Sequence, residues 1–592
     1  MPALQLPSLT FRSQESVNGR YGGVGLVIAS TKPKLAEESG GKRAPVARVE
    51  ESRFRGVTVM DAFEGYAFEK GLRVGDRLLS VGGTDVRGLG VEQVRDLLRG
   101  DPGTDVVVRY ERDVFGREAP VAKEALLNRE LVRVSDVRLA TLLGDKEEGV
   151  GYINLSGFNA GAGRDFGAAL LQLRMNAPND LRALVLDLRG NPGGLLEAAV
   201  EVASYLLPPR SEIVSSRGRD GVELVYRSAI EPIRPAGMKL VVLVNQGSAS
   251  AAEIVAGAVQ DMDAGVIVGS SRTFGKGLVQ KIIPLPYDSA LKFTVAKYYT
   301  PSGRCIQAIN YKGGRLLDPG VTNSNTPVDG QGEELSDGEN PDSSAIPESE
   351  RKTFFTSRGR IVRDGGGIEP DMLVPDMKAG PAESLFLAKG LYFDFISDYI
   401  RTHDALSSAR SAVVKERMAR LEDTRILGHS SMQNLVLEKF PTMKPATGLF
   451  EEFRKYIVAR INNGALSADE LFKKPLQSLE RSLSSAGLRE TLPSVDTLRA
   501  RITASVLRDL EVHRSEITND LELALYSREL PDRLLLQKNA LQDAQVRAAV
   551  ELSRDGAKYT ALLQSPDPNA PAIGPEGDKV YRIASAQAST DD

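Results

Sequence analysis

Residues 239–261 read KLVVLVNQGSASAAEIVAGAVQD, and this stretch decides the class of fold. An apolar run is followed by a tight turn of small polar residues and then by a segment of small residues typical of a crowded helix. Ser250 precedes Glu253 by three positions, which is the spacing of a capping box at a helix N-terminus. The stretch therefore predicts a strand, a turn and a helix in that order.

The same alternation continues on both sides of this stretch. The run LRALVLDLRG at 181–190 is continuously apolar, as in strands that are buried on both faces of a parallel sheet. Strands that alternate with helices at this spacing predict βαβ crossovers around a largely parallel sheet. The further predicted elements are strands at 149–158 and 264–270 and helices at 163–176 and 194–207.

Other parts of the chain have a different residue pattern and composition. Short strands with glycine turns and one amphipathic helix at 90–100 predict a small separate domain. Residues 320–351 are acidic and rich in Pro, Gly and Ser, which predicts a disordered insertion, and residues 381–555 have helical periodicity. The predicted organisation is an N-terminal remnant at 1–20, a small domain at 21–113, an α/β core at 114–376, a helical C-terminal domain at 377–565 and a flexible tail at 566–592.

Composition excludes several classes of function. A net charge of −4 over 592 residues gives no electrostatic footprint for nucleic acid or for an anionic membrane. One cysteine, Cys305, excludes an internal disulfide framework and a thiolate metal cluster. With three scattered histidines, His403, His429 and His513, a zinc hydrolase is not expected, and no metal or other cofactor is predicted. The N-terminus has neither the basic region nor the apolar core of a signal peptide.

Ser250 has an inert interpretation and a catalytic one. As a helix N-cap it closes a capping box with Glu253, and many such serines have no chemical role. As the residue after a parallel strand, it stands where open α/β sheets bind their ligands, beside unpaired backbone N–H groups. The amide of Ala251 would then be a donor to an oxyanion. A catalytic serine also needs a base, and all the histidines lie far downstream.

Lys276, in TFGKGLVQ, is the candidate base. A lysine acts as a general base only where an apolar pocket lowers its pKa, so Lys276 is expected in a desolvated pocket. Gly275 and Gly277 would let the backbone approach closely, and Gln280 could orient the amine through a neutral hydrogen bond. The alternative is a surface lysine or a phosphate-binding lysine. A phosphate loop needs Ser or Thr after the lysine, where Gly277 stands.

A second oxyanion donor is expected from DLRGNPGGLLEAA at 187–199. This segment predicts a strand that ends in a Gly/Pro turn and opens a helix. The backbone amide of Gly193 or of Gly194 is the candidate donor. The alternative is an ordinary strand–helix connection, and the turn alone does not decide between the two.

Taken in order, several motifs resemble the carboxyl-terminal processing peptidases, also called tail-specific proteases, of bacteria and plastids. The motifs are YGGVGL, GLRVGDRLLSVGG, DLRGNPGGLLEAA, NQGSASAAEIVAGAVQD, TFGKGLVQ, KYYTPSGRCIQ and GGGIEPD. The resemblance runs from about residue 11 to 376 and extends to the helical region, which resembles the C-terminal extension of some bacterial members.

The resemblance implies a role for particular residues. Ser250 matches the nucleophile, Lys276 the general base and Gln280 the residue that orients it. The amides of Gly193 or Gly194 and of Ala251 match the oxyanion hole. Asp261 matches an acidic position sometimes linked to activity, with a structural role at the helix end as the alternative, and Ser248 is not expected to be the nucleophile. The implied fold is α/β, with a core related to crotonases and Clp proteases.

The small domain matches the PDZ module of that family. A glycine loop with free N–H groups leads into a strand edge, which suits capture of a C-terminal carboxylate and β-addition of a peptide. The alternative is a PDZ fold that only packs against the core or gates it. The predicted peptide-binding residues are Tyr21, Gly22, Gly23, Val24, Gly25 and Leu26.

The expected function is a PDZ-containing Ser/Lys endopeptidase that acts on proteins with exposed C-terminal tails. One alternative is an inactive scaffold or adaptor of the same family, and another is a crotonase-like acyl-CoA enzyme, against which the PDZ segment and the lysine motif argue. The C-terminal helices are compatible with oligomerisation or with docking of an adaptor. A stripe from Tyr392 to Tyr399 predicts helix core. The family implies an extracytoplasmic location, in a bacterial periplasm or envelope or in the thylakoid lumen.

Overall fold

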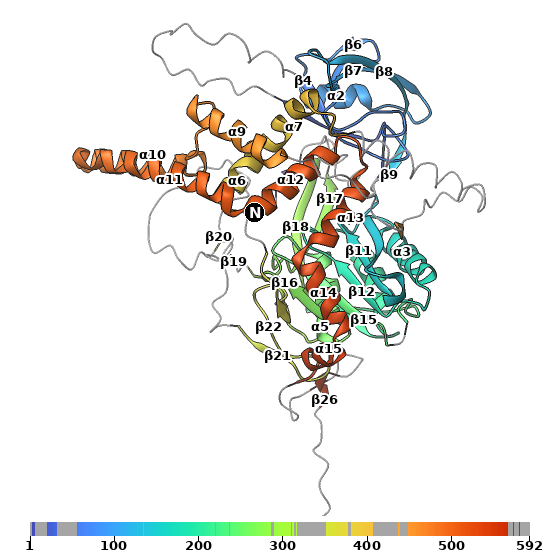
Figure 1. The fold of residues 1–592 in the computed structure, drawn as a ribbon. Coiled ribbons are helices and arrows are strands. Elements are labelled where there is room, and N and C mark those ends of the chain that lie inside the picture. Colours follow the sequence, from blue (N-terminus) through green and yellow to red (C-terminus); the bar gives the residue numbers. More distant parts are fainter. Residues whose placement is uncertain are drawn as a thin grey trace, which may run out of the picture.

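The structure is a computed structural model, shown in Figure 1, and it is described for most of the chain. The predicted insertion lies outside the described part up to residue 350, and so does most of the N-terminal remnant and of the tail. The described residues are 3–5, 20–31, 56–133, 135–219, 221–235, 237–285, 289–308, 311–312, 315–316, 351–376, 380–406, 436–437, 448–565, 572–573 and 579–580.

A seven-stranded sheet forms the centre of the α/β core. Its strand order is β23-β16-β15-β12-β11-β10-β24, and every neighbouring pair is parallel except β10 and β11. The predicted alternation of strands with helices around a largely parallel sheet is therefore confirmed. The strands are β10 (Val137–Leu143), β11 (Val150–Leu155), β12 (Ala183–Asp187), β15 (Lys239–Val244), β16 (Val266–Gly269), β23 (Met372–Leu373) and β24 (Val436–Leu437).

Each face of this sheet is covered by a layer of helices. Side chains alternate along a strand, so Leu240 and Val242 of β15 join one core cluster while Val241 and Leu243 join the other. The first cluster is covered by α3 (Ala162–Asn176), α4 (Leu196–Leu206) and α5 (Ala251–Asp261). The second is covered by α13 (Asp532–Gln542), α14 (Ala544–Arg554) and α15 (Gly556–Leu562), drawn in red across the sheet in Figure 1.

This second layer differs from the expectation of a helical region separate from the core. Helices α13 to α15 come from the end of the chain, yet they share one apolar cluster with the sheet. Periodicity predicts that a segment is helical, but it does not say which surface its apolar face will cover. The predicted helical domain at 377–565 therefore divides, because its last three helices complete the α/β core.

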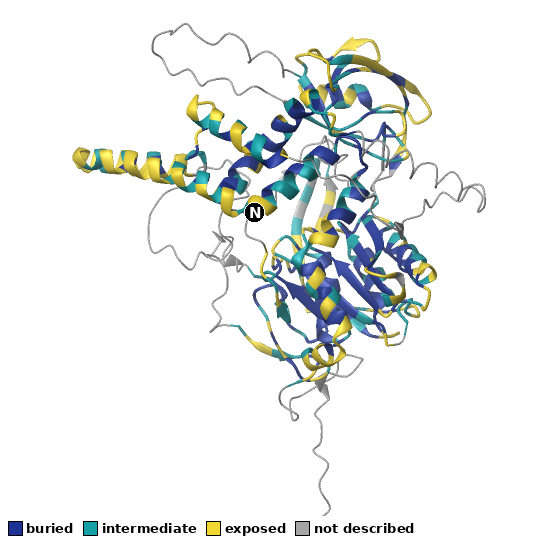
Figure 2. Cartoon of the chain, in the orientation of Figure 1, coloured by how far each residue is buried: buried dark blue, intermediate teal, exposed yellow. Residues whose placement is uncertain are grey.

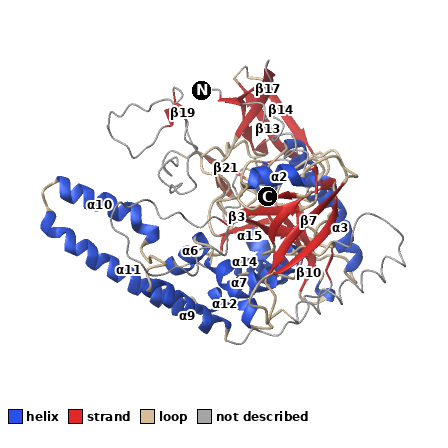
Figure 3. Ribbon diagram, turned by 90° about the horizontal axis from the view of Figure 1, so that it is seen from above, coloured by secondary structure: helices blue, strands red, loops and turns tan. Residues whose placement is uncertain are grey.

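The remaining helices form a bundle and an arm. Tyr392, Phe395, Ile396 and Tyr399 are all buried, which confirms the core stripe predicted from the sequence. Figures 2 and 3 show α10 and α11 projecting from the body as a largely exposed arm. The helices are α6 (Pro381–Ala388), α7 (Leu391–Thr402), α9 (Leu449–Asn462), α10 (Lys473–Ser485), α11 (Leu492–Val512) and α12 (Arg514–Tyr526). None of the helices among the described residues is both long and apolar enough to cross a bilayer.

The small domain has its own sheet and core. Strand β8 pairs with β7 along its whole length, so this domain continues past the predicted end at residue 113. The sequence gives little sign of β8, because it is an edge strand whose side chains are mostly exposed and show little apolar alternation. Helix α2 (Val91–Leu98) lies against β3, whose other edge has no strand partner among the described residues. The strands are β3 (Leu26–Thr31), β4 (Gly56–Ala62), β5 (Arg77–Val81), β6 (Thr84–Asp85), β7 (Asp105–Arg112) and β8 (Val121–Asn128), with β2 (Arg20–Gly23) pairing β9 (Glu130–Arg133).

An antiparallel five-stranded sheet packs next to the core and carries the segment after Lys276. Its longest hairpin joins β17 (Leu278–Leu285) to β18 (Ser289–Tyr299). Strand β18 also pairs with β13 and with the N-terminal strand β1. The other strands are β1 (Ala3–Gln5), β13 (Glu212–Gly218) and β14 (Glu223–Arg227), and separate short pairs are β19 (Tyr311–Lys312) with β20 (Arg315–Leu316), β21 (Thr353–Phe355) with β22 (Ile361–Arg363), and β25 (Ala572–Ile573) with β26 (Lys579–Val580).

Candidate active site

Ser250 lies at the carboxyl edge of the parallel sheet, between β15 and the first turn of α5. Its backbone has φ +54° and ψ −112°, a conformation that a residue with a side chain rarely adopts. Such strain is held in place only when the surroundings determine it, and it is common at functional sites. The predicted capping box with Glu253 is present, and the Ser250 side chain is partly buried. The turn therefore presents Ser250 in the way that strained strand–helix turns present nucleophiles.

The side chain of Glu253 connects the Ser250 turn to the Lys276 segment. Its Oε2 accepts hydrogen bonds from the backbone N–H of Ser250 at 2.9 Å and from that of Lys276 at 2.8 Å. Its Oε1 accepts from the Gly275 N–H at 2.7 Å and from Thr273 Oγ1 at 2.6 Å. Complete burial raises the pKa of the Glu253 carboxyl, and the four donors oppose that rise. One carboxylate thus holds together the two segments that carry the candidate nucleophile and base.

The Gly193–Gly194 turn lies directly against Ser250. A Cβ added to Gly193 would be 2.8 Å from both the Ser250 Cβ and the Ala251 nitrogen. The Gly193 N–H is already used, because it donates to Asn191 Oδ1 at 2.8 Å. The N–H groups of Gly194 and Ala251 have no acceptor among the described residues. Of the two glycines named from the sequence, Gly194 is therefore the one whose amide is available.

Three hydrogen bonds join residues 188–191, which lead into this turn, to the loop before Ser250. Gly190 N–H donates to Asn245 Oδ1 at 2.9 Å, and Ser248 Oγ donates to the Leu188 carbonyl at 2.7 Å. Farther along, the Ala249 N–H donates to the Asn191 carbonyl at 2.9 Å. Ser248 is fully buried at this contact, which agrees with the expectation that it is not the nucleophile.

Lys276 and Gln280 are exposed, which corrects the expectation of a lysine in a desolvated pocket. No hydrogen bond joins Ser250 Oγ to Lys276 Nζ, although both residues are within the described part of the chain. Gln280 lies at a register shift between β17 and β18, four residues after Lys276 on the same segment. The glycines next to Lys276 do provide close approach, since a Cβ on Gly275 would be 2.4 Å from that of Ala308. The backbone of the lysine is fixed at the site while its side chain faces solvent.

Asp261, the last residue of α5, has a structural environment. Its Oδ1 accepts from Arg304 Nη2 at 2.8 Å and its Oδ2 from the Ser302 N–H at 3.0 Å. Both side chains of the Asp261–Arg304 pair are almost completely inaccessible to solvent. The helix-end alternative stated for Asp261 is thus the one that its contacts favour.

The glycine loop of the small domain has free backbone donors. The N–H groups of Val24 and Gly25 have no acceptor among the described residues. Gly25 has φ +69°, and a Cβ there would lie 2.5 Å from that of Tyr66. Gly22 and Gly23 belong to β2, so only part of the predicted segment, Tyr21 to Leu26, forms an open loop before β3.

Sequence reasoning missed several groups at the same edge of the sheet. Arg189 forms an ion pair with Asp187, at the end of β12, and a second one with Asp543, at the start of α14. Burial lowers the pKa of Arg189, and the neighbouring carboxylate of Asp187 raises it. The net result is a pKa above its usual value. Asp543 does carry a local signal, because an aspartate three residues before Val546 reads as a helix N-cap, but nothing in the sequence pairs it with Arg189.

The described residues contain no cluster of His, Cys, Asp and Glu able to hold a metal ion.

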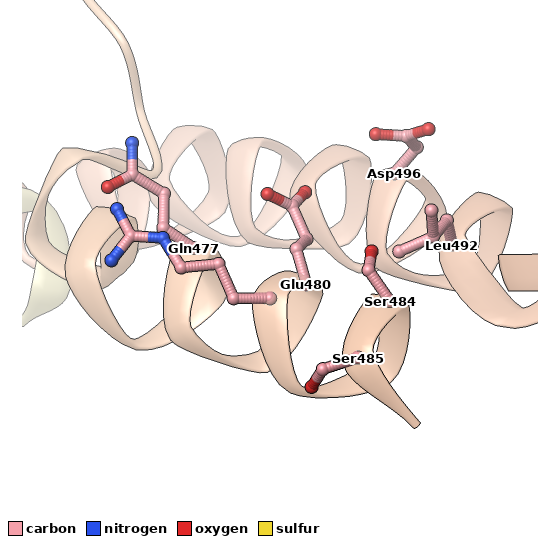
Figure 4. Close-up of a pocket in the computed structure, with 7 residues that line it drawn as sticks. Gln477, Glu480, Ser484, Ser485, Leu492 and Asp496 are labelled. Atoms are coloured by element: carbon pink, nitrogen blue, oxygen red, sulfur yellow. The ribbon is translucent and has the colours of Figure 1, made fainter. Parts of the chain in front are cut away.

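A surface pocket lies between α10 and α11, away from the Ser250 turn, and Figure 4 shows that it is polar, with side chains of both charges. Arg499 neutralises its carboxylates, through ion pairs to Glu480 and Asp496. The lining residues are Gln477, Glu480, Arg481, Ser484, Ser485, Leu492 and Asp496.

Three parts of the chain match known protein families. Residues 149–313 match peptidase family S41, residues 64–112 match the PDZ domain, and residues 432–552 match the probable PDZ-protease C-terminal helical domain. The chain is 34% identical over 297 residues to a carboxy-terminal-processing protease of Bartonella bacilliformis, covering 50% of this chain and 61% of that protein. It is 39% identical over 239 residues to a carboxyl-terminal-processing protease of Synechocystis sp., covering 40% of this chain and 52% of that protein.

A solved structure, that of a photosystem II D1 C-terminal processing protease, is 30% identical, with 52% of this chain and 75% of that chain covered and a TM-score of 0.29. The family matches define a protein with a PDZ domain, an S41 peptidase domain and a C-terminal helical domain. Over 40–50% of its length the chain is similar to proteins named carboxyl-terminal processing proteases. It spans less than two thirds of the length of the two curated relatives named above.

Proposed function

We propose that this protein is a serine endopeptidase that captures the exposed C-terminal tails of proteins through its PDZ domain and cleaves them near the C-terminus. Ser250 is the nucleophile, Lys276 the general base and Gln280 the residue that orients the lysine. The observation that carries this proposal is the Glu253 carboxylate, which binds the backbone N–H of Ser250 and of Lys276 through a single oxygen. An inert capping box would not need the second of these bonds.

The geometry supports acyl transfer on Ser250. Its Oγ attacks the scissile carbonyl carbon and loses its proton to Lys276 Nζ, while the carbonyl oxygen becomes negatively charged. The free N–H groups of Gly194 and Ala251 stabilise that charge, and the N-terminus of α5 adds the positive end of its dipole. Lys276 then protonates the leaving amine, and water releases the acyl group from Ser250.

Because Lys276 is exposed, the bound substrate must also help to form the catalytic site. Since Lys276 faces solvent, a peptide bound across the Ser250 turn must cover its amine and bring it to Ser250. Catalytic hydrogen bonds that are open in a free enzyme commonly close only in the complex with substrate. The enzyme is thus incomplete until a tail is bound. The relation of the core to the crotonase and Clp-protease fold and the extracytoplasmic location stay predictions from the family.

Turnover of a loosely folded reporter with an apolar C-terminal tail tests the dyad. Ser250→Ala and Lys276→Ala should each lower kcat by at least about a thousandfold, because neither residue can activate or replace the other. Lys281→Ala is the matched control, since Lys281 is an exposed lysine of the same β17 segment and should retain activity. Full activity in Lys276→Ala would refute the mechanism. A wild-type protein that binds the tail but leaves it intact would favour the scaffold alternative.

The PDZ loop gives a separate prediction about tail capture. Amidation of the reporter's C-terminus removes the carboxylate that the Val24 and Gly25 amides would bind, so KM should rise about tenfold or more. Gly25→Ala should have the same effect on the free tail, because its Cβ would collide with Tyr66. Gly83→Ala is the control, since Gly83 also has a positive φ but open space around it. An unchanged KM for the amidated tail would show that this loop does not read the carboxylate.

A further inference from the structure

The start of α14 is bound to the strand end that carries the candidate oxyanion turn. Arg189 Nη1 donates to Asp543 Oδ2 at 2.8 Å and to Gln545 Oε1 at 3.0 Å. The same guanidinium binds Asp187 through two further nitrogens, with Nε to Oδ1 at 2.9 Å and Nη2 to Oδ2 at 2.7 Å. Arg189 is therefore fixed between its own strand and a helix from the end of the chain.

Arg189 immediately precedes the turn at the site. Gly190 begins that turn, and its N–H donates to the side chain of Asn245, on the loop that leads to Ser250. Arg189 and Gly190 are joined by a peptide bond, so a shift of the Arg189 backbone also shifts Gly190 and, along the same turn, Gly194. The position of the free Gly194 amide thus depends on what holds Arg189.

The contact of Gln545 extends the same network to the other side of Ser250. Its side chain is buried, and its Nε2 donates to the Val374 carbonyl at 3.0 Å and to Asp376 Oδ1 at 2.6 Å. Val374 follows β23, which is next to β16 at the edge of the sheet, and Asp376 accepts from Ser270 at the end of β16. The start of α14 therefore ties together the carboxyl ends of strands β12, β16 and β23.

We propose that Asp543 and Gln545 are positioning residues for the peptidase, so that the C-terminal helices hold the oxyanion turn in its catalytic geometry. The inference deepens the proposed function and rests on it. Charge-assisted hydrogen bonds are the stronger class, and within the described residues Asp543 and Gln545 are the only acceptors of Arg189 Nη1. Without them that arm of the guanidinium is free, and Asp187 alone has to hold the side chain.

Two substitutions of Asp543 separate this role from helix capping. Asp543 also caps α14, since its Oδ1 accepts from the Val546 N–H at 2.9 Å. Asparagine caps a helix about as well as aspartate does, but when its oxygen accepts from Val546 its NH2 group stands where Oδ2 accepts from Arg189, and an NH2 group cannot accept that bond. Glutamate caps poorly but keeps the charge that pairs with Arg189. Capping alone would rank Asp543→Asn above Asp543→Glu, and the positioning role predicts the reverse order.

The experiment measures kcat and KM of the full chain on the tailed reporter. We expect Asp543→Asn to lower kcat about tenfold with little change in KM, and Asp543→Glu to lower it less. Asp555→Asn should leave both constants unchanged, because Asp555 caps α15 in the same way but makes no ion pair among the described residues. A kcat in Asp543→Asn equal to that of wild type, or lower in Asp543→Glu than in Asp543→Asn, would overturn the inference.

Hydrogen exchange gives a readout that does not depend on turnover. The Gly190 and Gly193 amides are hydrogen-bonded to Asn245 and Asn191, and they should exchange faster in Asp543→Asn than in wild type or in Asp555→Asn. Unchanged exchange would refute the positioning role even if the protein proved inactive. A Ser250→Ala protein that keeps its activity would refute the proposed function alone, because the exchange result would still stand.

Discussion

Glu253→Gln is expected to lower kcat/KM of the proposed peptidase about a hundredfold and to destabilise the core by about 2 kcal/mol. The glutamate is fully buried and accepts two hydrogen bonds at each oxygen. An amide group replaces one of these oxygens with a donor, so two of the four donors would face an N–H group. One orientation of the glutamine releases the bonds to Ser250 and Lys276, and the other releases those to Gly275 and Thr273, so either orientation loosens the Lys276 segment.

The measurement pairs reporter turnover with a thermal unfolding midpoint. Glu383→Gln is the matched control, because Glu383 also lies in the first turn of a helix, α6, but away from the Ser250 turn. We expect that control to keep its activity. If Glu253→Gln turned over the reporter as wild type does, the connection between the two segments would have no catalytic importance, and the main support for the proposed dyad would be lost.

Arg304→Met is expected to cost about 3–5 kcal/mol of stability, because it leaves the Asp261 carboxylate buried without its charged partner. The Arg304 side chain is almost fully inaccessible and its guanidinium also donates to Gln260 Oε1 at 2.7 Å. Methionine fills a comparable space without a charge, so the loss reports on the unpaired carboxylate rather than on a cavity. Denaturant unfolding at neutral pH, followed through the core, measures the effect.

The double variant Arg304→Met with Asp261→Asn should recover part of this loss, since no buried charge then remains. Arg87→Met is the control from an exposed ion pair with Asp85, and its unfolding midpoint should hardly change. A midpoint for Arg304→Met equal to that of wild type would mean that water reaches Asp261. Loss of activity without loss of stability would instead favour the catalytic interpretation of Asp261.

Local rules were sufficient for most of the sheet and for the turn at its edge. The capping box at Ser250 depends on a spacing of three residues, and the strand before it depends on a continuous apolar run, so both are written in consecutive positions. The core stripe of α7 is likewise a repeat within one helix. These features depend on neighbours in sequence, and the sequence therefore determined them by itself.

Only the tertiary structure decided how distant segments meet. The Gly194 amide is available and the Gly193 amide is not, because the Gly193 N–H donates to the Asn191 side chain. The Lys276 side chain is exposed, and this depends on how the described segments around it pack. The ion pair of Arg189 with Asp543 joins residues 354 positions apart, and the apolar face of α14 could have covered any apolar surface of similar shape. Periodicity records how much of a helix is apolar but not its partner, because the hydrophobic effect has no direction. The sequence determined the elements and the candidate residues, and the packing of the last helices on the sheet decided what holds those residues in place.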